Sequence, residues 1–181
     1  VSLLGELNFQ FPEGAHAIGR LDARSEGLLL LTTNKRITRL LFQSDIPHKR
    51  TYIVRVNGVM PADTAIKLST GIDIVADGGA LYRTMPCSVE ILDGPPDFLE
   101  SYQLEQRPSA PHTWIKMSLV EGKYHQVRKM VRATRFPCRR LIRSAIEDMT
   151  IIGMKPGDVR EMDEETFFRL LKLSDSNGTT N

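Results

Sequence analysis

Two segments far apart in the chain alternate apolar and polar side chains, and this alternation limits the fold more than any other feature. In residues 51–57, Tyr52, Val54 and Val56 fall on one face of an extended chain. Residues 113–120 place Ile115, Met117 and Leu119 opposite Trp114, Lys116 and Ser118. A period of two is typical of β-strands with one face against a core. We therefore expect both segments to be strands of a sheet.

The remaining elements do not alternate regularly between strand and helix, which favours an α+β fold over a doubly wound α/β fold. Asp93 to Pro111 is rich in proline and is predicted to be a long surface loop, and the polar residues 174–181 a frayed tail. A turn is expected at 77–79. Further strands are expected at 28–32, 85–92 and 138–146, and helices at 33–43, 61–70, 124–135 and 163–173.

Cysteine, histidine and apolar spacing argue against several classes of protein. Cys87 and Cys138 are too far apart in sequence for a clustered metal site and too few for a disulfide framework, and the four histidines show no metal-ligand spacing. The longest apolar run, Leu28 to Leu31, is far shorter than the roughly 20 residues that a membrane span needs. We expect no metal, no membrane contact and a reducing, cytoplasmic location.

Charge is unevenly distributed along the chain. The formal net charge of the whole is only +2. From Glu121 to Arg143, however, eight Lys or Arg residues accompany one acid, so this segment carries +7 and the remainder −5. Arg128, Arg132 and Arg135 would share one face of a helix, where they repel one another unless anions accompany them. This pattern is typical of a nucleic-acid contact, although a solvated basic face remains an alternative.

Two further positions are candidates for chemistry. The sequence G-R-L-D-A-R-S-E-G, from Gly19 to Gly27, places Asp22 on a short loop just before an apolar run. Such an Asp can act as a nucleophile or a general base, or it can simply bond to backbone amides of a turn. Tyr52 begins an alternating strand beside basic residues, where its ring can stack on a nucleobase or pack into the core.

These segments together resemble the catalytic motifs of the RNA pseudouridine synthases, in the branch that modifies ribosomal RNA. The first motif matches Gly19 to Thr32, the second resembles Arg50 to Val54, and the third resembles Glu121 to Met130. The resemblance extends over residues 16–173, and residues 111–116 point to one subgroup of this branch. It implies a mixed, mainly antiparallel sheet flanked by helices, with a central active-site cleft.

The resemblance also implies an activity and roles for residues. The chain would convert a specific uridine of ribosomal RNA, in the 23S molecule, to pseudouridine without a cofactor. Asp22 would be the catalytic carboxylate, either attacking the nucleoside or removing a sugar proton. Arg128 would pair with Asp22, Tyr52 would pack on the flipped base, and Arg20 would fill the vacated stack or hold a phosphate.

The resemblance also implies the domain organisation, the oligomeric state and a set of residues that contact the RNA backbone. Residues 1–181 would form a single catalytic domain, and a monomer, without the family's first strand and its Lys-Pro signature. The expected RNA-binding residues are Lys123, His125, Gln126, Lys129, Arg132, Arg139 and Arg140.

Two alternatives come from other classes of protein. One is a non-catalytic module that binds ribosomal RNA through the basic helix. The other is a hydrolase with Asp22 as its nucleophile. A glycosidase would need a second carboxylate about 5–9 Å from the first, and the nearest acid in the sequence motif is Glu26.

Overall fold

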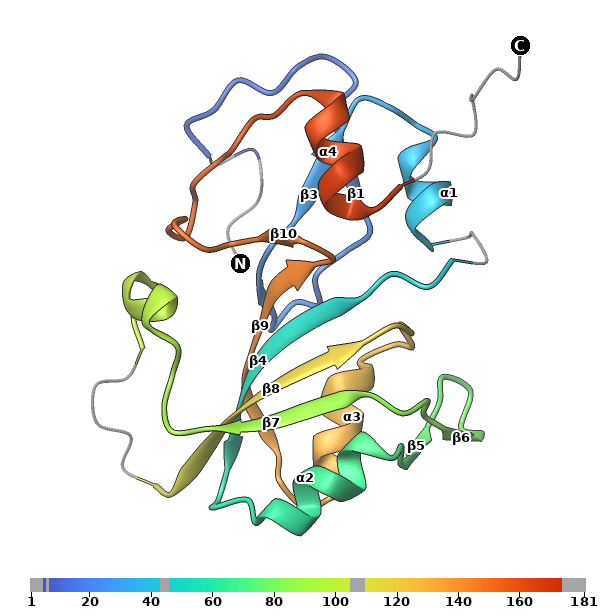
Figure 1. Ribbon diagram of the computed structural model, residues 1–181, viewed down its shortest axis with the longest axis vertical. Coiled ribbons are helices and arrows are strands. Elements are labelled where there is room, and N and C mark those ends of the chain that lie inside the picture. Colours follow the sequence, from blue (N-terminus) through green and yellow to red (C-terminus); the bar gives the residue numbers. More distant parts are fainter. Residues whose placement is uncertain (1–4, 6, 43–45, 105–109, 174–181) are drawn as a thin grey trace.

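The computed structural model describes residues 5, 7–42, 46–104 and 110–173, and its centre is an antiparallel sheet (Figure 1). The strand order is β10-β9-β4-β8-β7. A short strand, β2, joins β9 in parallel and makes the sheet mixed. The predicted α+β class with a mainly antiparallel sheet is confirmed. The strands are β2 (Glu26–Gly27), β4 (Arg50–Asn57), β7 (Ser88–Leu92), β8 (His112–Leu119), β9 (Cys138–Ile146) and β10 (Met149–Thr150).

Strand β4 lies at the middle of the sheet and has apolar side chains on both faces. Val54 and Val56 are fully buried in one core cluster, and Ile53, 2% exposed, belongs to the other. The alternation therefore predicted the strand correctly, but it does not mark one wet face. β4 is hydrogen-bonded to β8 on one side and to β9 on the other, so it forms the centre of the sheet.

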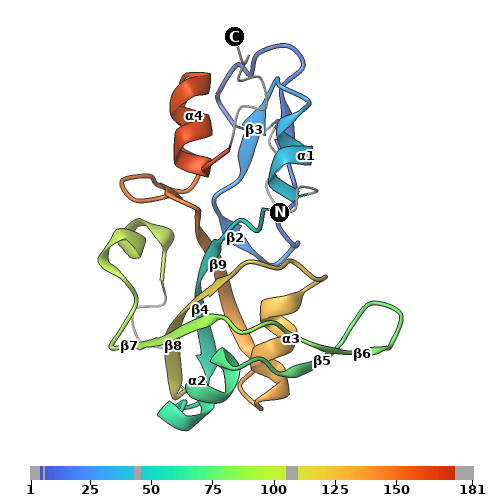
Figure 2. The same ribbon diagram turned by 45° about the vertical axis from the view of Figure 1, so that its right-hand side comes forward.

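Two helices, α2 (Ala62–Ser69) and α3 (Gln126–Ala133), pack on one face of the sheet (Figure 2). From α3, Val127, Met130 and Val131 enter the core cluster that contains Val54, as the helical spacing predicted. This packing places the first turn of α3, and the loop before it, beside the ends of β4 and β9.

The other core lies beneath β1 (His16–Ile18), β3 (Leu30–Thr32), α1 (Ile37–Phe42) and α4 (Glu164–Leu171), in the upper half of Figure 1. Asp163 caps α4 as predicted, because its Oδ1 accepts a hydrogen bond from the Thr166 amide at 2.7 Å. The end expected for the first helix, and the tail at 174–181, lie outside the described residues. Within the described ranges, no helix has both the length and the apolar character needed to cross a membrane.

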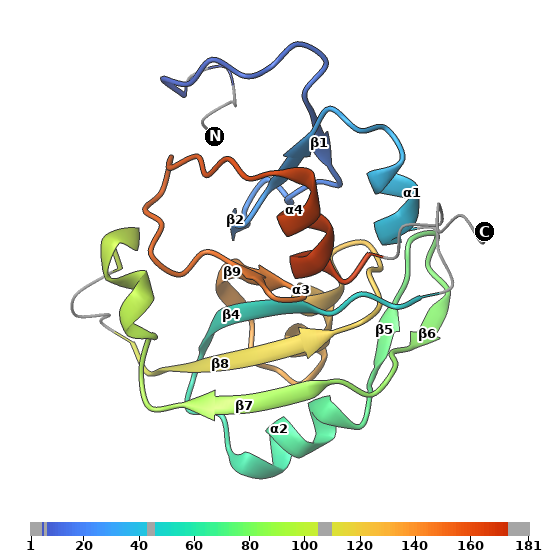
Figure 3. The same ribbon diagram turned by 45° about the horizontal axis from the view of Figure 1, so that its top comes forward.

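Part of the proline-rich segment is not the simple surface loop that the sequence predicted, and residues 105–109 of it lie outside the described residues. Residues Asp97–Tyr102 form a 3-10 helix whose Leu99 is fully buried and whose Tyr102 is 6% exposed. These apolar side chains explain the difference, since they give the segment its own anchor in the core. Beyond the other end of β7, strands β5 (Asp73–Val75) and β6 (Leu81–Arg83) form the hairpin around the predicted turn (Figure 3).

Candidate functional site

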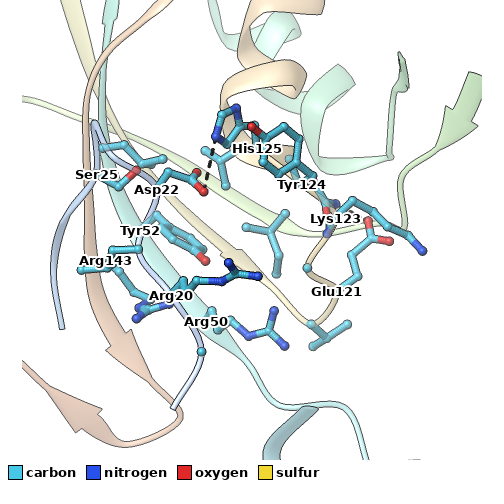
Figure 4. Close-up of a pocket in the computed structure, with 18 residues that line it drawn as sticks. Arg20, Asp22, Ser25, Arg50, Tyr52, Glu121, Lys123, Tyr124, His125 and Arg143 are labelled. Atoms are coloured by element: carbon cyan, nitrogen blue, oxygen red, sulfur yellow. Dashed lines mark hydrogen bonds and ion pairs between the residues drawn. The ribbon is translucent and has the colours of Figure 1, made fainter. Parts of the chain in front are cut away.

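A cavity of about 490 Å³ opens where the loop containing Asp22 faces the segment that leads into α3. Strands β4 and β9 supply its floor through Tyr52 and Arg143, and Arg20 and Arg50 also line it (Figure 4). The first, second and third sequence motifs therefore meet in one place. This size is within the usual range of small-molecule sites.

Asp22 lies in this cavity with its side chain 34% exposed. The Ser25 amide donates to the Asp22 carbonyl at 2.8 Å, which closes a turn just after the carboxylate. His125 Nε2 lies 3.5 Å from Asp22 Oδ1 (Figure 4). The turn thus fixes the backbone that carries the carboxylate, while the carboxylate itself faces an imidazole and stays open to solvent.

Tyr52 and Arg143 come together because they are partners across the β4–β9 ladder, next to an irregularity between Thr51 and Tyr52. Arg143 is only 5% exposed, and its Nε donates to the Leu28 carbonyl at 2.9 Å. Burial lowers the pKa of Arg143, while the Tyr52 hydroxyl and the Asp22 carboxylate act in the opposite direction. Its Nη2 is buried and has no hydrogen-bond partner among the described residues, so the guanidinium keeps a donor available.

Gly27 allows this arrangement. It has a φ of +101° on β2, and a Cβ there would collide with the Arg143 carbonyl oxygen. Only glycine lets the chain leaving the Asp22 loop run this close to β9. Replacing it would separate the loop from the strand that carries Arg143.

The expected ion pair between Arg128 and Asp22 is wrong in this structure. Arg128 Nη2 donates instead to the Arg24 carbonyl and, at 3.5 Å, to the Ser25 hydroxyl. Its Nη1 lies 3.5 Å from Cys138 Sγ. The sequence pattern predicted that Arg128 lies on a helix, but it did not show which way the side chain points. That direction depends on how α3 packs. Arg128 therefore holds the backbone just after Asp22, and the basic side chains near the carboxylate are His125 and Arg143.

Several of the expected RNA-binding residues have partners inside the protein. His125 faces Asp22, and Arg139, although exposed, donates from its Nε to Asn57 Oδ1 at 2.7 Å. Arg140 forms two hydrogen bonds to Glu26, at 2.8 and 2.7 Å, and Gln126 is 5% exposed and accepts from the Lys123 amide. The pairing with Arg140 also occupies Glu26, the carboxylate that a glycosidase would have required. Of the expected RNA-binding residues, Lys123, Arg132 and Arg139 are exposed, and Lys129 and His125 are half-buried. Arg20, which was expected to contact the substrate, is also exposed.

Sequence reasoning did not select Arg143, Arg50 or Glu121 as site residues. Arg143 could have been found, because an arginine within the apolar strand Leu141–Ile146 is a buried charge that needs partners. Glu121 accepts from the Tyr82 hydroxyl at 2.6 Å and the Met85 amide at 2.8 Å, so it ties the β5–β6 hairpin to the loop before α3. No sequence spacing indicates that contact.

In the part of the chain that the structure describes, no three His, Cys, Asp or Glu side chains are grouped so that they could hold a metal ion. Burial raises the pKa of both thiols, Cys87 and Cys138, to about 11. Neither cysteine is therefore a ready thiolate ligand at neutral pH.

Comparison with known proteins identifies relatives. The family described as RNA pseudouridylate synthase matches residues 6–133. Ribosomal large subunit pseudouridine synthase E of Vibrio parahaemolyticus is 33% identical over 147 residues, which are 81% of this chain and 60% of the relative. The synthase E of Xanthomonas axonopodis pv. citri is 33% identical over 82% of this chain and 76% of its own length. These relatives confirm the subgroup that residues 111–116 indicated.

More distant similarities agree with the fold. Ribosomal large subunit pseudouridine synthase B of Bacillus subtilis is 29% identical over 91% of this chain and 60% of its own. A crystal structure of a pseudouridylate synthase superposes with a TM-score of 0.70 at 23% identity, over 90% of this chain and 63% of that one. The chain spans about 60% of the length of the two Vibrio synthase E relatives.

Proposed function

Because the chain belongs to the RNA pseudouridylate synthase family, we propose that it converts a uridine of ribosomal RNA, in the 23S molecule, to pseudouridine. One observation carries the proposal: Asp22, Tyr52 and Arg143 line a single cavity, and each comes from a different segment. A carboxylate, an aromatic ring and a buried cation in one pocket suit a nucleoside whose base must be detached and held.

The reaction is an isomerisation. The bond between N1 of the base and C1′ of the sugar breaks, a bond between C5 and C1′ forms, C5 loses a proton and N1 gains one. Nothing is oxidised or reduced. Asp22 acts at the sugar, either on C1′ or on a sugar proton, and both routes need an ionised, oriented carboxylate. Arg143 compensates its negative charge, and the turn closed by Ser25 fixes the backbone that carries it.

Tyr52 and Arg20 act on the flipped nucleotide and on the helix it leaves. A uridine must leave its stack to reach Asp22, at a cost of a few kcal/mol. Tyr52 packs on the detached base, since its ring lines the cavity next to Arg143. Arg20, which is exposed at the rim, fills the vacated position or binds a phosphate. No step requires a metal or a cofactor.

The RNA backbone lies across the cations on α3 and the segments flanking it, next to this cavity. Lys123 precedes α3, Lys129 and Arg132 lie on this helix, with Arg132 in its last turn, and Arg139 extends the surface onto β9. Such contacts position the RNA without reading its sequence. We place the protein in the cytoplasm, acting as a monomer.

The test is release of tritium from transcribed 23S rRNA fragments labelled at C5 of uridine, because the reaction expels that hydrogen. We expect release from at least one fragment and a pseudouridine at a single position of it. Binding to fragments without release from any of them would favour the alternative, a non-catalytic RNA-binding module.

A further inference from the structure

Tyr124 is an aromatic side chain on the rim of the catalytic cavity, and it is unusually accessible. Its exposed fraction is 58%, although it lines the cavity that contains Asp22. It belongs to neither of the two core clusters of buried residues and the apolar side chains packed on them. The proposed chemistry at Asp22 makes no use of it. A large exposed ring at a binding site more often serves a partner than the fold.

One face of the Tyr124 ring is already ordered by the protein. The ring stacks on His125, with centroids 3.9 Å apart and planes at 18° (Figure 4). His125 has a φ of +53°, a left-handed conformation that is uncommon outside glycine and that costs free energy. The strained backbone turns the imidazole toward Asp22 and leaves the tyrosine outside it. The result is a short stack that ends 3.5 Å from the catalytic carboxylate.

Lys129 contacts this stack, and Lys123 lines the same cavity. The Lys129 amine lies 5.3 Å from the centre of the Tyr124 ring, and the Lys123 amine lies 4.7 Å from the centre of the Tyr82 ring. An exposed cation–π contact is weak and the lysine side chain is flexible, so an arriving base can displace the amine from the ring. The displaced ammonium is then free to bind the phosphate of the nucleotide that replaced it.

We infer that Tyr124 is a stacking site for an unpaired nucleobase of the RNA, the one adjacent to the target uridine. The inference rests on the proposed function, because the uridine must occupy the cavity beside Asp22 for its neighbour to reach the rim. A base on Tyr124 extends the Tyr124–His125 stack and keeps His125 against the carboxylate. The contact accepts any base, since every base has a π face.

Fluorescence of 2-aminopurine tests this contact, because stacking on an aromatic ring quenches it. The probe is a short single-stranded RNA with one uridine, carrying 2-aminopurine on its 5′ side in one version and on its 3′ side in another. We expect the wild-type protein to quench one version on binding. Tyr124→Phe keeps the quenching, whereas Tyr124→Ala loses it and binds roughly 5- to 150-fold more weakly.

Ile66→Ala is the matched control, because Ile66 is similarly exposed, at 64%, but lies on α2 away from the cavity. It should bind and quench like the wild type. Equal affinity and quenching for Tyr124→Ala and the wild type would overturn the stacking site. The proposed formation of pseudouridine would not be contradicted by that result. Failure of the wild type to release tritium, with quenching that still depends on Tyr124, would overturn the proposed activity and not the stacking site.

Discussion

The cations between Glu121 and Arg143 divide into two groups that a sequence does not distinguish. The inward group, Arg128, Arg140 and Arg143, is buried or half-buried and donates to backbone carbonyls or to Glu26. The outward group is mostly exposed, and four of its members lie on α3 or the turns flanking it. The outward group consists of Lys123, Lys129, Arg132, Arg135 and Arg139.

The difference separates two uses of positive charge. An inward guanidinium loses its hydration, so it needs hydrogen-bond acceptors within the protein. These fixed bonds set the geometry of the loops that it joins. An outward one keeps its water and is available to phosphates, with an effect that salt screens. The +7 of this segment therefore overstates the RNA-binding surface, because three of its charges hold the site together. The predictions below test this division.

The largest effect is expected at Arg143. Arg143→Gln removes the buried charge beside Asp22 and Tyr52, and we expect kcat to fall about 10²–10³-fold, as when one preorganised electrostatic group is lost. Arg143→Lys keeps the charge and should retain more activity. Thermal unfolding of both variants checks for the lost bond to the Leu28 carbonyl. Equal activity of Arg143→Gln and the wild type would contradict a role for the inward charge in catalysis.

A smaller effect is expected at Arg128, which acts through the loop and not on the substrate. Arg128→Ala frees the backbone at Arg24 and Ser25, and a displacement of about 1 Å at Asp22 can cost up to roughly 10²-fold in rate. Arg128→Lys should recover part of kcat, since an ammonium can still donate to the Arg24 carbonyl. The loss should appear in kcat, with little change in KM. A dominant rise in KM would instead assign Arg128 to the RNA.

The smallest effects belong to the outward group. Arg132→Glu should weaken RNA binding and lower the slope of log affinity against log salt by about 1 to 2, with no change in melting temperature. Lys67→Glu carries the same change of charge on α2 and is the control. Filter binding over a series of salt concentrations measures both. Equal losses for the two variants would mean that the RNA-binding surface is not localised.

The sequence predicted most of the fold because the apolar spacing of each element agreed with its neighbours. The bounds of β9 are those expected from its apolar pattern, and Asp163 caps α4 as expected. The prediction of a surface loop was wrong for residues 97–102, because Leu99 and Tyr102 are too few to show a period, yet they enter the core. Local pattern cannot reveal an anchor that depends on a distant partner.

The site was predictable in its parts and not in its pairings. Motif spacing brought Asp22, Tyr52 and the start of α3 together correctly. It could not show that Arg143 faces Tyr52, because that neighbour is set by the β4–β9 register across about 90 residues of chain. The ion pair between Arg128 and Asp22 was predicted wrongly for a similar reason: helix periodicity gives a face, and packing decides what that face contacts.

The most direct test of the central claim, that Asp22 is the catalytic carboxylate, is single-turnover tritium release by Asp22→Asn on an rRNA fragment that the wild type modifies. Asparagine has the same shape but no negative charge. We expect release to be lost while the affinity for the RNA and its dependence on salt remain close to those of the wild type. Release at the wild-type rate would contradict the account.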